Sequence, residues 1–130
     1  MLELQPDIAV VILETGVNDS FRMLHPNFIK NTITKIVEHL QRSGITVLLA
    51  GMQPVTTVGE KYGIEFRRIY KEIAAEQNII LIPSMLDGIA GNPRLNLTDG
   101  IHPTEEGHRI IADTIYPYLI KALGENSLLH

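Results

Sequence analysis

Three short apolar segments constrain the fold of this chain most strongly. They are Ile-Ala-Val-Val-Ile-Leu at 8–13, Ile-Thr-Val-Leu-Leu-Ala at 45–50 and Ile-Ile-Leu-Ile at 79–82. Short apolar runs that are rich in β-branched residues and lack polar alternation are typical of strands covered on both faces. A segment of helical periodicity separates each run from the next. The sequence therefore predicts right-handed βαβ units and a parallel sheet.

Three segments with helical periodicity accompany these predicted strands. In each, apolar residues recur at spacings of three and four, which gives one apolar stripe. The stripes comprise Ile29, Ile33, Ile36, Val37 and Leu40; then Tyr62, Phe66, Ile69, Tyr70 and Ile73; and last Ile111, Ile115, Leu119 and Leu123. Thr104 is expected to cap the third helix. The alternation runs through the whole chain, so we expect one domain over residues 1–130.

The composition argues against several functional classes. The formal net charge is -4 and there is no Lys/Arg cluster, so we expect no nucleic-acid partner. The absence of cysteine excludes disulfides and thiolate chemistry. No apolar run approaches the ~20 residues that a membrane span needs. The N-terminus lacks the pattern of a signal peptide, and the compartment stays open. No phosphate loop or dinucleotide fingerprint is present, and we expect no cofactor.

The polar loops of the chain are expected to meet at one edge of the sheet. Ligands of parallel sheets bind outside the carboxyl ends of the strands. The segments 14–20, 51–60 and 84–102 each follow a predicted strand. They should therefore emerge at this edge.

Asp99 and His102 form the first candidate pair for chemistry. His102 has the ordinary pKa range of a general base at neutral pH. Asp99 lies three residues earlier, in a glycine-containing loop, and could fix the tautomer of the imidazole by accepting a hydrogen bond. The alternative is structural, with Asp99 in a turn contact and His102 near the start of the following helix.

Asn18 and Asp19 follow the first predicted strand. An asparagine amide at a strand's carboxyl end can donate to a developing oxyanion. The alternative is a turn, in which Asn and Asp bond to the local backbone. A metal site would need Asp19, Asp99, His102 and His108. No familiar ligand spacing links these four residues, so we predict no metal centre.

Two segments in combination point to a family. Gly16-Val17-Asn18-Asp19 and Asp99-Gly100-Ile101-His102-Pro103 resemble motifs of the SGNH (GDSL-type) hydrolases, in their lysophospholipase, arylesterase and thioesterase branch. The resemblance implies a flavodoxin-like three-layer α/β/α sandwich with a parallel sheet. It also implies hydrolysis of small carboxylic esters or thioesters, such as aryl esters and lysophospholipids, through an acyl-enzyme.

The resemblance assigns roles residue by residue. Asn18 matches the oxyanion-hole asparagine, and Asp99 and His102 match the acid and base of the triad. Val17 departs from the pattern, because the family usually has glycine there. The family's Gly-Asp-Ser nucleophile motif is absent from these 130 residues, which start just before the family's third strand and are in that sense N-terminally truncated.

The missing motif has two consequences. By the family's route the isolated chain is expected to have little activity, since the nucleophile and two oxyanion donors are missing. Ser20 and Ser84 are the candidate substitute nucleophiles, because both follow predicted strands.

The family's first strand, which would lie beside strand 8–13, is also absent from these residues. Strand 8–13 is therefore expected to be an exposed edge, which favours a homodimer or pairing through that strand. The alternative function is a non-catalytic self-association module or an inactive fragment of the family.

Overall fold

The computed structural model describes residues 9–16, 22–52, 59–83, 94–95, 97 and 103–129. Strands and helices alternate along this part of the chain, as the sequence predicts. The elements are β1 (Val10–Leu13), α2 (Pro26–Arg42), β2 (Thr46–Ala50), α3 (Glu60–Gln77), β3 (Ile80–Ile82) and α4 (Glu105–Leu129).

The three strands form one parallel sheet in the order β1-β2-β3. Val10 pairs with Thr46 at one end of the first ladder, and Leu48 pairs with Ile80 in the second. The central strand, β2, is buried from Val47 through Ala50. This burial explains why its sequence is a continuous apolar run rather than an alternating one.

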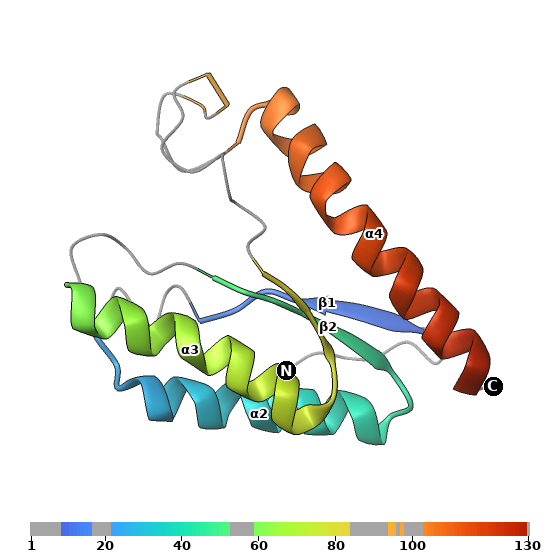
Figure 1. The fold of residues 1–130 in the computed structure, drawn as a ribbon, viewed down its shortest axis with the longest axis horizontal. Coiled ribbons are helices and arrows are strands. Elements are labelled where there is room, and N and C mark those ends of the chain that lie inside the picture. Colours follow the sequence, from blue (N-terminus) through green and yellow to red (C-terminus); the bar gives the residue numbers. More distant parts are fainter. Residues whose placement is uncertain are drawn as a thin grey trace.

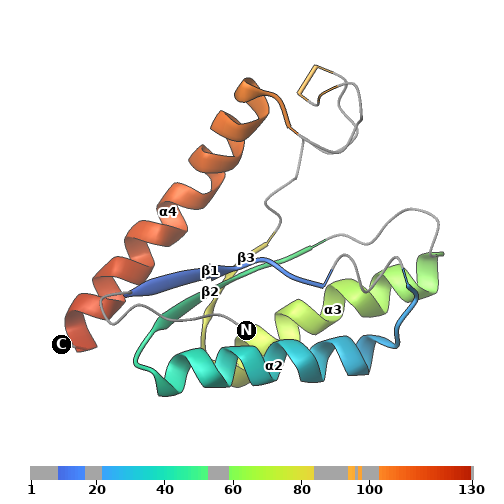
Figure 2. The ribbon, with the colours of Figure 1, turned by 180° about the vertical axis from the view of Figure 1, so that it is seen from behind.

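The helices cover the two faces of the sheet unequally. Helices α2 and α3 lie together on one face, and α4 lies alone across the other (Figures 1 and 2). Helix α4 contacts all three strands, whereas α2 and α3 contact each other and β2, and α3 also contacts β3. The arrangement confirms the predicted three-layer α/β/α sandwich with a parallel sheet.

The ends of α2 follow from its sequence. His25 is the N-cap, and its Nδ1 accepts a 3.1 Å hydrogen bond from the Asn27 N–H. Pro26 follows at the first helical position, where its missing N–H costs nothing. Gly44 follows the C-cap with a φ of +78°, a conformation that glycine adopts without strain. Four of the five predicted stripe residues are buried: Ile29, Ile33, Val37 and Leu40.

Helix α4 differs from its predicted apolar stripe at one position. Leu123 is 42% exposed, so its assignment to the buried stripe is wrong. The neighbouring Ala122 is fully buried instead, and Tyr118 packs against the core together with Ile111, Ile115 and Leu119. A small residue allows this turn of the helix to approach the sheet closely, which turns Leu123 towards solvent. Pro117 lies inside the helix without ending it.

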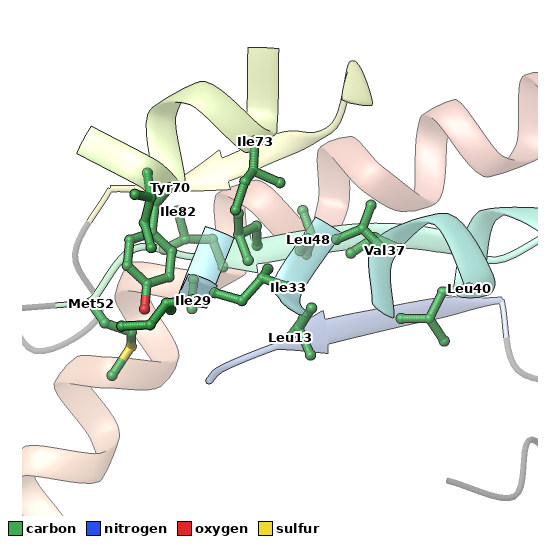
Figure 3. Close-up of a cluster of buried hydrophobic side chains, with 14 of the residues drawn as sticks. Leu13, Ile29, Ile33, Val37, Leu40, Leu48, Met52, Tyr70, Ile73 and Ile82 are labelled. Carbon is green, nitrogen blue, oxygen red and sulfur yellow. The ribbon is translucent and has the colours of Figure 1, made fainter. Parts of the chain in front are cut away.

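The hydrophobic core lies between the sheet and the helices. Figure 3 shows side chains from α2 (Ile29, Ile33, Val37, Leu40) gathered with Leu13, Leu48, Ile73 and Ile82. Tyr70 is the largest fully buried side chain of this core. Among the described helices, none is both long and apolar enough to cross a membrane.

Candidate functional site

The candidate site is the carboxyl edge of the sheet, where the strands lead into the polar loops. The predicted site residues Asn18, Asp19, Ser20, Ser84, Asp99 and His102 all lie outside the described residues. Their convergence and their roles therefore stay predictions. The described residues on either side of them show how the backbone enters and leaves these loops.

Tyr70 of α3 holds the residues that follow the carboxyl end of β1, here called the exit of β1. Its hydroxyl donates a 2.7 Å hydrogen bond to the Thr15 carbonyl, across 55 residues of sequence. Gly16 follows with a φ of +107°, and a Cβ at Gly16 would collide with the same Tyr70 hydroxyl. Gly16 is therefore required both for its backbone conformation and for space. Figure 3 shows the Tyr70 ring next to Ile29, with the hydroxyl oxygen on the side of Ile29.

The residues that follow β2 and β3 contact each other at Gly51. The Gly51 N–H donates a 2.7 Å hydrogen bond to the Ile82 carbonyl, which extends the ladder one residue beyond β2. A Cβ at Gly51 would lie 2.5 Å from the carbonyl oxygen of Pro83. Any other residue would force the two exits apart. The described residues that precede 53–58 and Ser84 thus lie close together.

The segment that contains Asp99 and His102 begins and ends at two residues in direct contact. The Thr104 N–H donates a 2.8 Å hydrogen bond to the Leu95 carbonyl. Leu95 is buried, only 4% exposed. The same carbonyl oxygen would lie 2.5 Å from a Cβ at Gly107, in the first turn of α4. The residues on either side of segment 96–103 are therefore hydrogen-bonded to each other, and Gly107 leaves the space that this contact needs.

Thr104 also starts α4, as the sequence predicts. Its Oγ1 accepts a 3.1 Å hydrogen bond from the Gly107 N–H, which is the bond expected of an N-cap. Glu105 and Glu106 occupy the first turn, where the helix dipole favours negative charge. Glu106 also pairs with Arg94 at 3.4 Å, but both side chains are largely exposed and the pair should contribute little.

Sequence reasoning missed the polar role of the tyrosines on α3. Tyr62 and Tyr70 were interpreted as members of an apolar stripe, and their rings do pack on that side. Their hydroxyls, however, reach main-chain carbonyls of another segment, Leu24 and Thr15. The available signal was the use of tyrosine rather than phenylalanine in an apolar stripe, since a hydroxyl that packs against the core needs a partner.

Two further features concern binding. No group of His, Cys, Asp and Glu side chains in the described ranges could hold a metal ion. His108, one of the four ligands considered, is exposed on α4. A cavity of about 150 Å³ lies between the start of α2 and α3, lined by His25, Asn27, Arg68 and Glu72 among others. Its described lining residues belong to α2, the N-cap of α2 and α3.

Comparisons with known proteins agree with the sequence motifs. Residues 1–110 match the GDSL-like Lipase/Acylhydrolase family. Esterase TesA of Pseudomonas aeruginosa is 30% identical over 111 residues, which are 85% of this chain and 55% of that protein. An arylesterase of Vibrio mimicus is 30% identical over 118 residues, 91% of this chain and 58% of that protein.

The crystal structure of TesA is also similar in three dimensions. Its TM-score is 0.81 at 29% sequence identity, and the match covers 88% of this chain and 63% of that one. The chain thus spans a little over half the length of the curated relatives that it matches.

Proposed function

The chain belongs to the GDSL-like lipase/acylhydrolase family, and from that premise we propose that it hydrolyses small carboxylic esters or thioesters. The observation that supports the proposal is the match of residues 1–110 to the family, together with the order of the two motifs along the chain. Gly16 follows β1, and Pro103 and Thr104 precede α4. We expect both motifs to lie at the edge at which parallel sheets bind ligands.

The proposed mechanism gives each motif residue one task. His102 takes the proton from an attacking serine hydroxyl, while Asp99 fixes the imidazole in the required tautomer. The side-chain amide of Asn18 donates to the oxyanion of the tetrahedral intermediate. The leaving alcohol or thiol departs with the proton from His102. Water then attacks the acyl-enzyme by the same route and releases the acid.

We propose a serine as the nucleophile, with Ser20 and Ser84 as its candidates in this chain. Ser20 adjoins Asn18-Asp19, and Ser84 follows Pro83 at the end of β3. The alternative is a serine of a Gly-Asp-Ser motif outside these 130 residues. Ser20→Ala and Ser84→Ala, each compared with the addition of a Gly-Asp-Ser-containing family segment, would distinguish the sources. Loss of turnover in one variant identifies that serine, whereas a gain only on addition supports the external source.

Turnover of a short-chain aryl ester tests the function. His102→Ala should lower kcat by at least about 10³-fold, because the general base is lost. His108→Ala is the matched control, since His108 is an exposed histidine of α4, and it should leave kcat unchanged. Turnover that persists in the His102→Ala protein would refute the proposed mechanism. Absence of turnover in the wild type would favour the non-catalytic alternative.

We further propose that a second copy of the chain pairs along β1. This strand is at an edge of the described three-stranded sheet, and Ile12 is 38% exposed. An unpaired strand edge offers free N–H and C=O groups to another chain. Sedimentation should detect a dimer that Ile12→Pro, which removes a donor from the open edge of β1, converts to monomer. A stable monomer at high protein concentration would contradict this proposal.

A further inference from the structure

Two tyrosine hydroxyls of α3 bind the main chain on either side of the segment that contains Asn18. The Tyr70 hydroxyl donates to the Thr15 carbonyl at 2.7 Å, before the segment. The Tyr62 hydroxyl donates to the Leu24 carbonyl at 2.6 Å, after it. The two acceptors are nine positions apart in sequence and the two donors are on one helix. Helix α3 thereby determines where the β1–α2 connection begins and ends.

The two tyrosines are themselves held in place by Phe66. Tyr62, Phe66 and Tyr70 are spaced four residues apart, so their side chains lie along one side of the helix. The rings of Tyr62 and Phe66 are stacked with centroids 6.2 Å apart, and those of Phe66 and Tyr70 meet edge to face at 5.4 Å. Phe66 is fully buried and Tyr70 is 1% exposed. Packing therefore leaves the rings little freedom to move the hydroxyls.

Both ends of the connection use backbone conformations that side chains disfavour. Gly16 has a φ of +107°, and a Cβ there would meet the Tyr70 hydroxyl. Met23, directly before Leu24, has a φ of +54°. A non-glycine residue in the left-handed region persists when its surroundings determine it. The hydrogen bond to the Leu24 carbonyl is one such determinant.

We propose that Tyr62 and Tyr70 are positioning residues for the oxyanion asparagine. Asn18 is two residues after Gly16 and six before Leu24 in the sequence, between the two carbonyls that the tyrosines bind. The inference rests on the proposed function. It adds that the aromatic side of α3 holds the described main chain on both sides of the segment that contains Asn18.

Hydrogen exchange tests the positioning without reference to activity. The variants are Tyr62→Phe, Tyr70→Phe and the double variant, and each retains the ring. Tyr116→Phe is the matched control, because Tyr116 is 63% exposed on α4. Exchange in peptides covering 14–25 should accelerate in both single variants and further in the double variant. Peptides of α4 should be unchanged, and the control should behave as the wild type.

The kinetic readout separates positioning from mere stability. Each single variant should lower kcat for the aryl ester by about 10-fold, less than the cost of deleting an oxyanion donor. KM should stay within a factor of about two, since the bonds act on transition-state stabilisation and not on ground-state binding. Assays are run well below the thermal midpoint of each variant, so that loss of folded protein does not contribute.

The outcomes are distinguishable from failure of the proposed function. If the wild type does not hydrolyse the ester, the proposed function fails, and exchange over 14–25 alone decides whether the hydroxyls hold the segment. Unchanged exchange in the double variant would overturn the inference. Faster exchange with unchanged kcat in an active protein would also overturn it, because the two bonds would then be purely structural.

Discussion

Gly107 and Leu95 approach so closely that a Cβ at Gly107 would lie 2.5 Å from the Leu95 carbonyl oxygen. Leu95 is only 4% exposed, and its carbonyl also accepts the hydrogen bond from Thr104. The first turn of α4 thus lies directly against the residue that precedes the Asp99–His102 segment. A methyl group at Gly107 would have to displace backbone rather than the end of a flexible side chain.

Gly107→Ala is expected to destabilise the protein even though alanine is the better helix former. The added Cβ should cost about 1–3 kcal/mol by overpacking. Gly124→Ala, in the same helix, is the matched control, because no atom lies within 4 Å of its added Cβ. That variant should gain about 0.5–1 kcal/mol from helix propensity. Urea unfolding measures both, and equal effects at the two sites would contradict the close approach.

Thr104→Ala should also weaken the start of α4. It removes the Oγ1 that accepts from the Gly107 N–H, at an expected cost of about 1 kcal/mol. Thr104→Ser keeps the oxygen and should remain close to the wild type. Thermal unfolding of both variants checks this prediction. If the serine variant were as unstable as the alanine variant, methyl packing and not capping would be the role of Thr104.

At position 78, the C-cap of α3, glycine should give a more stable protein than alanine. It has a φ of +54°, a left-handed conformation that costs a β-carbon-bearing residue about 1–2 kcal/mol and that asparagine tolerates best. Asn78→Ala is expected to lower the free energy of unfolding by about 1 kcal/mol, while Asn78→Gly should be neutral or slightly stabilising. Denaturant midpoints distinguish the two. A stabilising alanine variant would exclude the left-handed conformation.

Lys30 links α2 to α3 and should give a pH-dependent contribution to stability. Its Nζ lies 2.8 Å from Glu72 and 2.9 Å from Glu76. The hydrogen bond to Glu72, and to a lesser extent the one to Glu76, raises the pKa of Lys30 above its ordinary value of 10.5. Because the pKa of Lys30 is higher in the folded state, protonated Lys30 stabilises the fold fully at pH values below its pKa in the unfolded chain. This contribution is lost as the pH rises through the folded pKa.

Lys30→Met measures this contribution. The variant keeps an apolar stem and should be about 1 kcal/mol less stable at neutral pH. The difference from the wild type should shrink once the pH exceeds 10.5 and passes the raised pKa. Arg109→Met is the control, because its 3.4 Å pair with Glu105 is largely exposed and should contribute little. A difference that persists unchanged at high pH would assign the effect to packing.

Much of the fold could be predicted because burial dictates sequence pattern. The continuous apolar run of β2 indicates a strand covered on both faces, and Val47 through Ala50 are buried as expected. Thr104 could also be predicted as the N-cap of α4, since capping is local chemistry, and its Oγ1 accepts from the Gly107 N–H. The error at Leu123 arose because helical periodicity alone does not reveal that the neighbouring Ala122 is the buried residue of this turn.

The supports of the candidate site could not be predicted in the same way. The hydrogen bond between Tyr70 and Thr15 spans 55 residues, and no local pattern encodes it. The requirements for glycine at Gly51 and Gly107 come from carbonyl groups of distant segments, Pro83 and Leu95. Such contacts depend on the packed tertiary structure, whereas the motifs containing Asn18, Asp99 and His102 could be recognised from residue type and order.

The parallel sheet also bears on how the chain acquires its structure. Neighbouring strands are joined through a whole helix, so no strand can pair with the next by a tight hairpin. The entropic cost of closing each connection must be met before the strands can hydrogen-bond. We therefore expect slower folding than in a protein dominated by local contacts. During synthesis, β2 emerges from the ribosome before β3 does. We expect early docking of α2, which contacts β2, to shield this apolar run from other nascent chains.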